Sequence, residues 1–112
     1  KVANRMMMEV HYYTPYQFTL MDKDADWGKM FYYWGKGNRS TTDTESNPTW
    51  GEEADLDKLF KSMKTQFVDK GIPVILGEFG AIRRSNLTGS NLTLHLESRA
   101  YYLKYVVQQL LN

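Results

Sequence analysis

The chain has 112 residues, enough for one small domain, and its fourteen Lys and Arg against thirteen Asp and Glu give a formal net charge of +1. This balance argues against a charged surface for nucleic acid or a membrane, and no apolar run is long enough to predict a membrane span. Without cysteine, disulfides, thiolate zinc sites and cysteine nucleophiles are excluded. No signal peptide is expected, because residues 1–5 are polar and lead into a short apolar run.

A first strand is predicted over residues 6–12, where a short and mostly apolar run fits a buried parallel strand. Pro15 prevents its continuation as a central strand. Residues 14–48 show the glycines and small polar residues of a loop, with room for a turn or two of helix over residues 24–34. Ten of the sixteen aromatic residues lie between Tyr12 and Trp50, so we expect an ordered and functional loop rather than a disordered one.

Two helices and a second strand complete the predicted pattern. Thr49 and Glu52 fit a capping box for a helix that runs to about residue 70, where Gly71 and Pro73 end it. A second apolar strand follows over residues 73–79, then a polar loop over residues 86–91 and a helix over residues 94–111. The predicted buried stripes are Leu56, Leu59, Phe60, Met63 and Phe67 on the first helix, and Leu96, Ala100, Leu103, Val107 and Leu110 on the second.

This strand–helix–strand–helix order predicts an α/β fold with parallel strands joined by a right-handed crossover. Parallel sheets need several strands and cover on both faces, which two strands and two helices cannot supply. The residues that would otherwise lie at open edges are Val10, Val74, Ile75 and Leu76. We therefore expect the chain to be a piece of a larger domain. A flavodoxin-like half-domain has a similar pattern, but no phosphate-binding loop follows either strand.

Polar residues at the carboxyl ends of the two strands are the candidates for chemistry. Glu78 follows four apolar residues and a glycine, at the edge where parallel β/α folds place their ligands. His11 and Tyr13 stand two residues apart at the matching end of the first strand, and both can donate hydrogen bonds to a carboxylate. Glu9 stands two residues before His11, so it points to the same side of the strand but lies farther from the strand end. The alternatives are a structural Glu78 that caps backbone donors or pairs with an arginine (Arg83 or Arg84), a core His11 and a packing Tyr13.

The aromatic residues of the loop suggest a carbohydrate ligand, because sugar rings present apolar C–H faces on which flat side chains stack. The alternative is a satellite core beneath the loop, and we expect about half of these side chains to be core and one or two to form a platform. The residues concerned are Trp27, Tyr32, Tyr33, Trp34 and Trp50. No metal site is expected, since His11 and His95 are far apart in the chain and lack companion ligands.

Three stretches of this sequence resemble glycoside hydrolase family 5, in particular its bacterial endoglucanase and xyloglucanase branch. They are residues 9–18 (EVHYYTPYQF), 33–35 (YWG) and 71–81 (GIPVILGEFGA). The resemblance implies a fragment of a TIM (β/α)8 barrel, with strands six and seven, their helices and a long aromatic loop, so that residues 1–112 form a partial catalytic domain. It further implies a retaining mechanism with Glu78 as the nucleophile, Tyr13 near it, and His11 at the substrate or in the carboxylate network. Substrate contacts are expected from Tyr16, Trp27, Trp34 and Trp50.

The sequence also departs from the family pattern. In this family the acid/base is a glutamate that directly follows an asparagine, and no Asn-Glu pair occurs among the 112 residues. The expected function is therefore a portion of a retaining endo-β-1,4-glucanase for β-1,4-glucan or xyloglucan, inactive in isolation. We expect it to need the remaining barrel segments or other copies of the chain, but no cofactor, and to lie outside the cell or on its surface. The alternative is a catalytically inactive fragment that binds glucan or assembles with itself.

Overall fold

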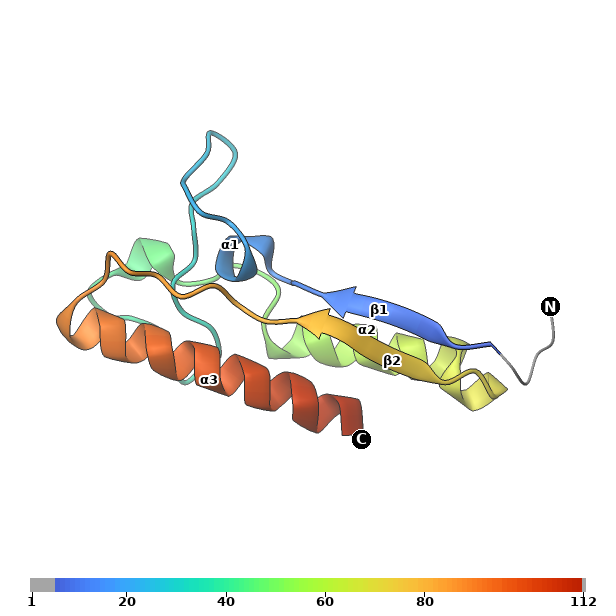
Figure 1. Ribbon diagram of the computed structural model, residues 1–112. Coiled ribbons are helices and arrows are strands. Elements are labelled where there is room, and N and C mark those ends of the chain that lie inside the picture. Colours follow the sequence, from blue (N-terminus) through green and yellow to red (C-terminus); the bar gives the residue numbers. More distant parts are fainter. Residues whose placement is uncertain (1–5, 112) are drawn as a thin grey trace.

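The computed structural model describes residues 6–111; residues 1–5, on which the expectation of no signal peptide rests, lie outside it. Two parallel strands, β1 (Met8–Tyr12) and β2 (Val74–Phe79), lie side by side, and the helices α2 (Glu53–Gln66) and α3 (Gly89–Leu111) pack against them (Figure 1). The predicted order of strands and helices is confirmed. Both strands point toward the same end of the molecule, where the loops gather.

The hydrophobic core lies between the strand pair and the two helices. Tyr12 contributes from β1, Leu56 and Phe60 from α2, and Tyr102 and Val106 from α3, and all five side chains are buried or nearly so. The opposite face of the strand pair, which we call the open face, carries the side chains of Glu9, His11, Ile75 and Glu78. All four are exposed, so this part of the chain leaves one side of its sheet without cover.

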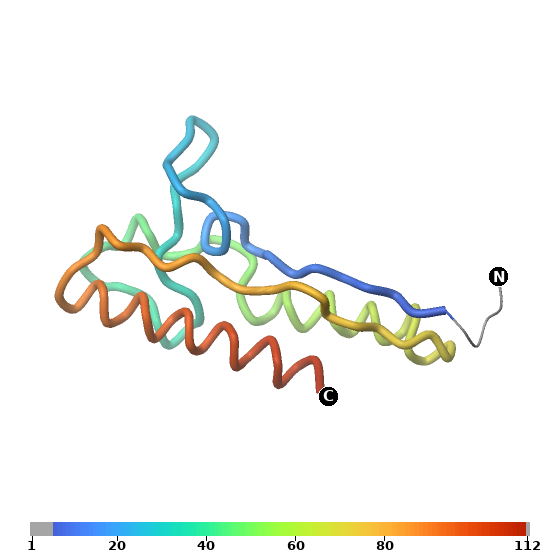
Figure 2. The backbone as a smooth tube through the Cα atoms, in the orientation of Figure 1, coloured from blue at the N-terminus to red at the C-terminus, as the bar shows by residue number. Residues whose placement is uncertain are grey.

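The connection from β1 to α2 is ordered but holds little regular structure. It contains α1 (Tyr16–Thr19) and the short 3-10 helix η2 (Thr44–Ser46). The turn or two of helix considered for residues 24–34 does not form; instead Ala25 and Gly28 pair in an isolated antiparallel bridge, and the Asp24 carboxylate accepts the N–H of Met30 at 2.9 Å. Figure 2 shows the segment after α1 projecting beyond the strand ends, away from α2 and α3.

The capping box predicted for α2 is wrong. The helix begins at Glu53, and the Glu52 carboxylate is drawn into the loop, where it accepts the N–H of Gly35 at 3.1 Å and pairs with Arg39 at 2.9 Å. The Asp55 carboxylate instead accepts the N–H of Gly51 at 2.7 Å. At the other end α2 stops at Gln66 and a 3-10 turn, η3 (Val68–Lys70), follows; Gly71 then turns the chain with a φ of 83°, which favours glycine. Leu59 of the predicted stripe is exposed.

The stripe predicted for α3 is also wrong. The helix begins at Gly89, five residues earlier than expected, and buries His95, Ser98, Tyr102 and Val106, whereas its predicted stripe turns outward. Three tyrosines explain why this face of α3 is the inner one, because their phenols bond to neighbouring segments. Tyr101 donates to Glu53 and Tyr105 to Asp57, both on α2, and Tyr102 donates to the Thr14 carbonyl, at 2.8 to 3.2 Å. Of the predicted stripe, Ala100, Leu103, Val107 and Leu110 are exposed and Leu96 is half-buried.

Candidate active site

An irregularity in the strand pair aims Glu78 at the open face. Val10 pairs with Leu76, but the next residue of β1, His11, pairs with Glu78, so Gly77 is one extra residue in β2. Side chains alternate along a strand, and without this bulge Glu78 would point with Tyr12 into the helix-covered core. The bulge therefore places the carboxylate on the same face as His11.

Two polar side chains lie beside the Glu78 carboxylate, and one of them donates a hydrogen bond to it. The hydroxyl of Tyr13, the residue after β1, donates to Oε1 at 2.9 Å, and Nε2 of His11 lies 3.7 Å from Oε2. The hydrogen bond to Glu78 raises the pKa of the Tyr13 phenol, which keeps the phenol protonated as a donor. The structure thus brings together the three polar residues that the sequence singled out at the strand ends.

Two of the structural alternatives, a core His11 and an arginine paired with Glu78, are not found in residues 6–111. His11 is not a core histidine, since its side chain is 47% exposed. Arg84, considered as a partner of Glu78, is buried elsewhere and donates to the carbonyls of Met21 and Gln17, at 2.8 Å to the latter. Within residues 6–111 no ion pair joins Glu78 to an arginine.

Three exposed aromatic side chains lie beyond the end of β1. Tyr16 is 44%, Trp27 65% and Trp50 45% exposed, and the rings of Tyr16 and Trp27 are 6.1 Å apart between centroids. Gln17 holds Trp50, because its side-chain oxygen accepts the indole N–H of Trp50 at 3.0 Å. Gly28, next to Trp27, also lies against the Gln17 amide. We call Tyr16, Trp27 and Trp50 the aromatic surface.

Trp34, expected among the substrate-binding residues, is a core residue and that prediction is wrong. Its side chain is fully buried, and its indole N–H donates to the Gly51 carbonyl at 2.9 Å. The ring packs on Tyr102 at 5.0 Å, Tyr101 at 5.6 Å and Tyr105 at 5.7 Å between centroids. No sugar reaches a ring enclosed in this way.

Sequence reasoning missed a buried pair, His95 and Arg84, which holds the loop through Tyr32. His95 Nδ1 lies 2.6 Å from the Tyr32 carbonyl and Nε2 accepts the backbone N–H of Arg84 at 2.9 Å, so the neutral ring with its proton on Nδ1 satisfies both bonds. Burial lowers the pKa of His95 in the same sense. The Arg84 guanidinium also lies over the Tyr32 ring, 5.6 Å from its centroid. No sequence signal pointed to this pair, because His95 lies in a helix with many apolar residues and Arg84 lies in the loop after a strand.

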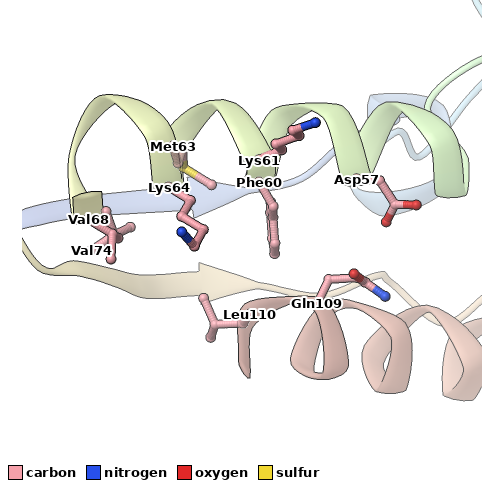
Figure 3. A pocket seen from close by; sticks show the side chains of 9 residues that line it. All are labelled: Asp57, Phe60, Lys61, Met63, Lys64, Val68, Val74, Gln109 and Leu110. Carbon is pink, nitrogen blue, oxygen red and sulfur yellow. The ribbon is translucent and has the colours of Figure 1, made fainter. Parts of the chain in front are cut away.

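Two cavities lie away from the open face. One of about 280 Å³ lies between α2, β2 and the end of α3; Figure 3 shows Phe60, Met63, Val74 and Leu110 around it, with charged groups at its rim. The other, of about 430 Å³, is lined by polar residues of the loop and of the first turns of α3, including Arg39, Asn91 and Glu97. Neither is lined by Glu78, His11 or Tyr13.

Over residues 6–111, no three His, Cys, Asp or Glu side chains are grouped so that they could hold a metal ion. In the same range, neither α2 nor α3 combines the length and apolar character that crossing a membrane requires.

Known sequences that this chain is similar to are endoglucanases. It is 39% identical over 111 residues to the xyloglucan-specific endo-β-1,4-glucanase of Bacteroides ovatus, a match that covers 96% of this chain and 20% of that protein. It is 37% identical over 102 residues to endoglucanase A of Paenibacillus barcinonensis, covering 91% and 22%. The chain thus spans about a fifth of the length of these relatives.

Solved structures agree with this similarity. The chain superposes with a TM-score of 0.80 and 35% identity on a Bacteroides ovatus xyloglucanase in complex with a heptasaccharide, covering 96% of this chain and 22% of that one. It superposes with a TM-score of 0.78 and 36% identity on a xyloglucan-specific β-1,4-glucanase from a ruminal metagenomic library, covering 94% and 26%. The family model for cellulase (glycosyl hydrolase family 5) matches residues 1–112. The chain therefore belongs to glycosyl hydrolase family 5, as a fragment of its barrel.

Proposed function

We propose that this chain supplies strands six and seven, with their helices and the long loop, to the barrel of a retaining endo-β-1,4-glucanase that acts on β-1,4-glucan or xyloglucan. The observation that carries the proposal is the Glu78 carboxylate, aimed by the Gly77 bulge at the open face and held by the Tyr13 hydroxyl. The relatives named for endoglucanase and xyloglucanase activity support the substrate class.

Glu78 is the nucleophile in this proposal. One carboxylate oxygen forms a bond to the anomeric carbon as the glycosidic C–O bond breaks, and the leaving oxygen takes a proton from a second carboxylic acid. The conjugate base of that acid then takes a proton from water, whose oxygen attacks the same carbon and releases Glu78 as a carboxylate, with Tyr13 and His11 positioned to stabilise the charge that returns to it. Net retention follows from the two displacements.

The acid/base comes from outside these 112 residues. In retaining enzymes the two carboxyl groups lie about 5–5.5 Å apart, on opposite sides of the scissile bond. Glu9 shares the open face with Glu78 but stands two residues before His11 on β1, farther from the strand end. It therefore faces the interior of a closed barrel rather than a leaving group above the strand ends.

The aromatic surface binds the glucan in this proposal. Tyr16 follows Tyr13, whose hydroxyl donates to Glu78, by three residues. The three aromatic side chains are exposed, the rings of Tyr16 and Trp27 lie 6.1 Å apart, and Trp50 is held by its hydrogen bond to Gln17. Stacking of aromatic rings on apolar sugar faces matches this combination. Since a polymeric glucan does not enter cells, we place the enzyme outside the cell or on its surface.

A completed barrel tests the nucleophile. In what we call the hybrid barrel, residues 1–112 replace the matching segment of the Bacteroides ovatus enzyme. Glu78→Gln in the hybrid barrel should lower kcat by about 10³-fold or more, whereas Glu97→Gln, which removes an exposed carboxylate from α3, should leave it unchanged. Azide should rescue Glu78→Ala on an activated aryl glycoside and give a glycosyl azide of inverted configuration. Retention of a tenth of the activity by Glu78→Gln would refute the assignment.

A second candidate function is a fragment that binds glucan or assembles with itself without catalysis. The exposed apolar residues of α3, Leu103, Val107 and Leu110, favour this reading, because such side chains are normally covered. Turnover in the hybrid barrel decides between the two, because only the first function predicts it. For the 112-residue chain alone we expect no hydrolysis of cellotetraose, since it lacks the acid. Turnover of cellotetraose that Glu78→Gln abolishes would show that the chain contains its own acid/base.

A further inference from the structure

Gly77 is glycine for a reason other than backbone conformation. Its φ is not among the positive values that favour glycine in residues 6–111, so a Cβ would cause no backbone strain there. A Cβ built on Gly77 would instead overlap the carboxylate of Glu9, with Oε2 as the nearest atom. The extra residue of the bulge therefore leaves the space in which the Glu9 side chain lies across the strand pair.

That carboxylate reaches the ring of His11. Glu9 Oε2 lies 3.5 Å from His11 Nε2, and the same nitrogen lies 3.7 Å from Glu78 Oε2. These are distances of ion pairs rather than of hydrogen bonds. The other oxygen of Glu78 is taken by Tyr13. One imidazole nitrogen thus faces two carboxylates, one at the reacting position and one deeper on the open face.

We propose that Glu9 is a positioning residue, which holds the His11 imidazole against Glu78 and depends on the missing side chain of Gly77 to do so. The inference rests on the proposed role of Glu78 as nucleophile. The His11 side chain is 47% exposed, and within residues 6–111 its only ion-pair partners are these two carboxylates. Without Glu9 the imidazole keeps one partner, and its Nε2 is free to turn away from Oε2 of Glu78.

A carboxylate in this place also needs a compensating partner once a barrel closes over it. The open face of a two-stranded fragment is the inner face of a barrel, where an unpaired charge is costly. His11 provides that partner to Glu9. The pair is therefore mutually dependent: Glu9 orients the imidazole, and the imidazole nitrogen gives the Glu9 carboxylate a polar neighbour.

The test is a double-mutant cycle in the hybrid barrel. Glu9→Gln should lower kcat by about 10- to 100-fold, because a small displacement of a group at a reacting centre costs that much, while KM stays within about twofold. In a His11→Asn background, Glu9→Gln should have no further effect. Glu97→Gln serves as the matched loss of a carboxylate and should change neither constant. Equal losses with and without His11 would overturn the proposal, as would wild-type kcat in Glu9→Gln.

Gly77→Ala provides an independent readout. Its Cβ should displace the Glu9 carboxylate and lower kcat as Glu9→Gln does, yet cost nothing more in a Glu9→Ala background, where the space is free. A loss of kcat that persists in the Glu9→Ala background would show that Gly77 is needed for the bulge itself. It would refute the argument that Gly77 leaves room for the Glu9 carboxylate. If Glu78→Gln stays active, the proposed function fails instead, whatever Glu9 does.

Discussion

Replacing Trp34 by alanine tests whether the loop tryptophans divide into core and surface as the structure shows. Trp34 is fully buried beneath the loop, whereas Trp27, on the same loop, is 65% exposed. The two substitutions remove the same indole from the same connection. A difference in their effects therefore reports the environment of each ring and not the chemistry of the side chain.

The expected cost follows from what the Trp34 ring contacts. Truncation of a buried tryptophan to alanine costs about 3–5 kcal/mol of unfolding free energy through lost burial and the cavity that remains. The Gly51 carbonyl also loses its donor, which adds about 1 kcal/mol or more if water does not replace it. At about 2–4 °C per kcal/mol for a barrel-sized domain, a loss of about 4 kcal/mol lowers Tm by roughly 8–16 °C. For Trp27→Ala we expect a change of about 2 °C or less.

Thermal unfolding of the hybrid barrel followed by circular dichroism measures both variants. Trp34→Phe is the milder companion, since it keeps an aromatic ring among the tyrosines but loses the hydrogen bond to Gly51, and its Tm should fall between parent and Trp34→Ala. If Trp34→Ala leaves Tm unchanged and raises KM, the ring is a sugar platform and the burial argument is refuted.

Three further predictions concern the aromatic surface, pH and association. Trp27→Ala should raise KM for cello-oligosaccharides severalfold with little change in kcat; an unchanged KM would remove Trp27 from the substrate contacts. Burial lowers the folded-state pKa of His95, so its contribution to stability is complete above about pH 6.5 and is lost as pH falls toward that lowered value; Tm should fall between pH 7 and 5, and less so in His95→Gln. An equal slope in both proteins would contradict this. The 112-residue chain alone should associate, because Leu103, Val107 and Leu110 are uncovered, and a folded monomer in light scattering would contradict that.

What could be predicted from the sequence is what depends on order along the chain. Two apolar runs separated by a helix predict parallel strands, and parallel strands end at the same edge, so Glu78, His11 and Tyr13 were expected together there. The structure has this arrangement, down to a hydrogen bond between Tyr13 and Glu78. Their catalytic roles stay predictions.

What could not be predicted depends on pairing between distant segments. The register shift at Gly77 exists only once β1 and β2 meet, and without it an alternating strand would aim Glu78 into the core. The buried face of α3 was misassigned because leucine and valine are more hydrophobic than tyrosine. The face that turns inward is instead the one whose tyrosine hydroxyls bond to α2. Trp34 gave no local signal of burial, since the tyrosines around it lie almost 70 residues later in the chain.

The exposure of the site argues that closing the barrel is part of building it. Glu78 and His11 are each about half exposed, so water screens the attraction between them and weakens the control that either exerts on the other. Further strands on the open face would remove that water and strengthen the same contacts without moving them. The helices that accompany those strands in a (β/α)8 barrel would lie beside α3 and cover the apolar residues that it exposes. Completion of the barrel would thus stabilise the fragment and turn a solvated carboxylate, with Tyr13 and His11 beside it, into a preorganised site.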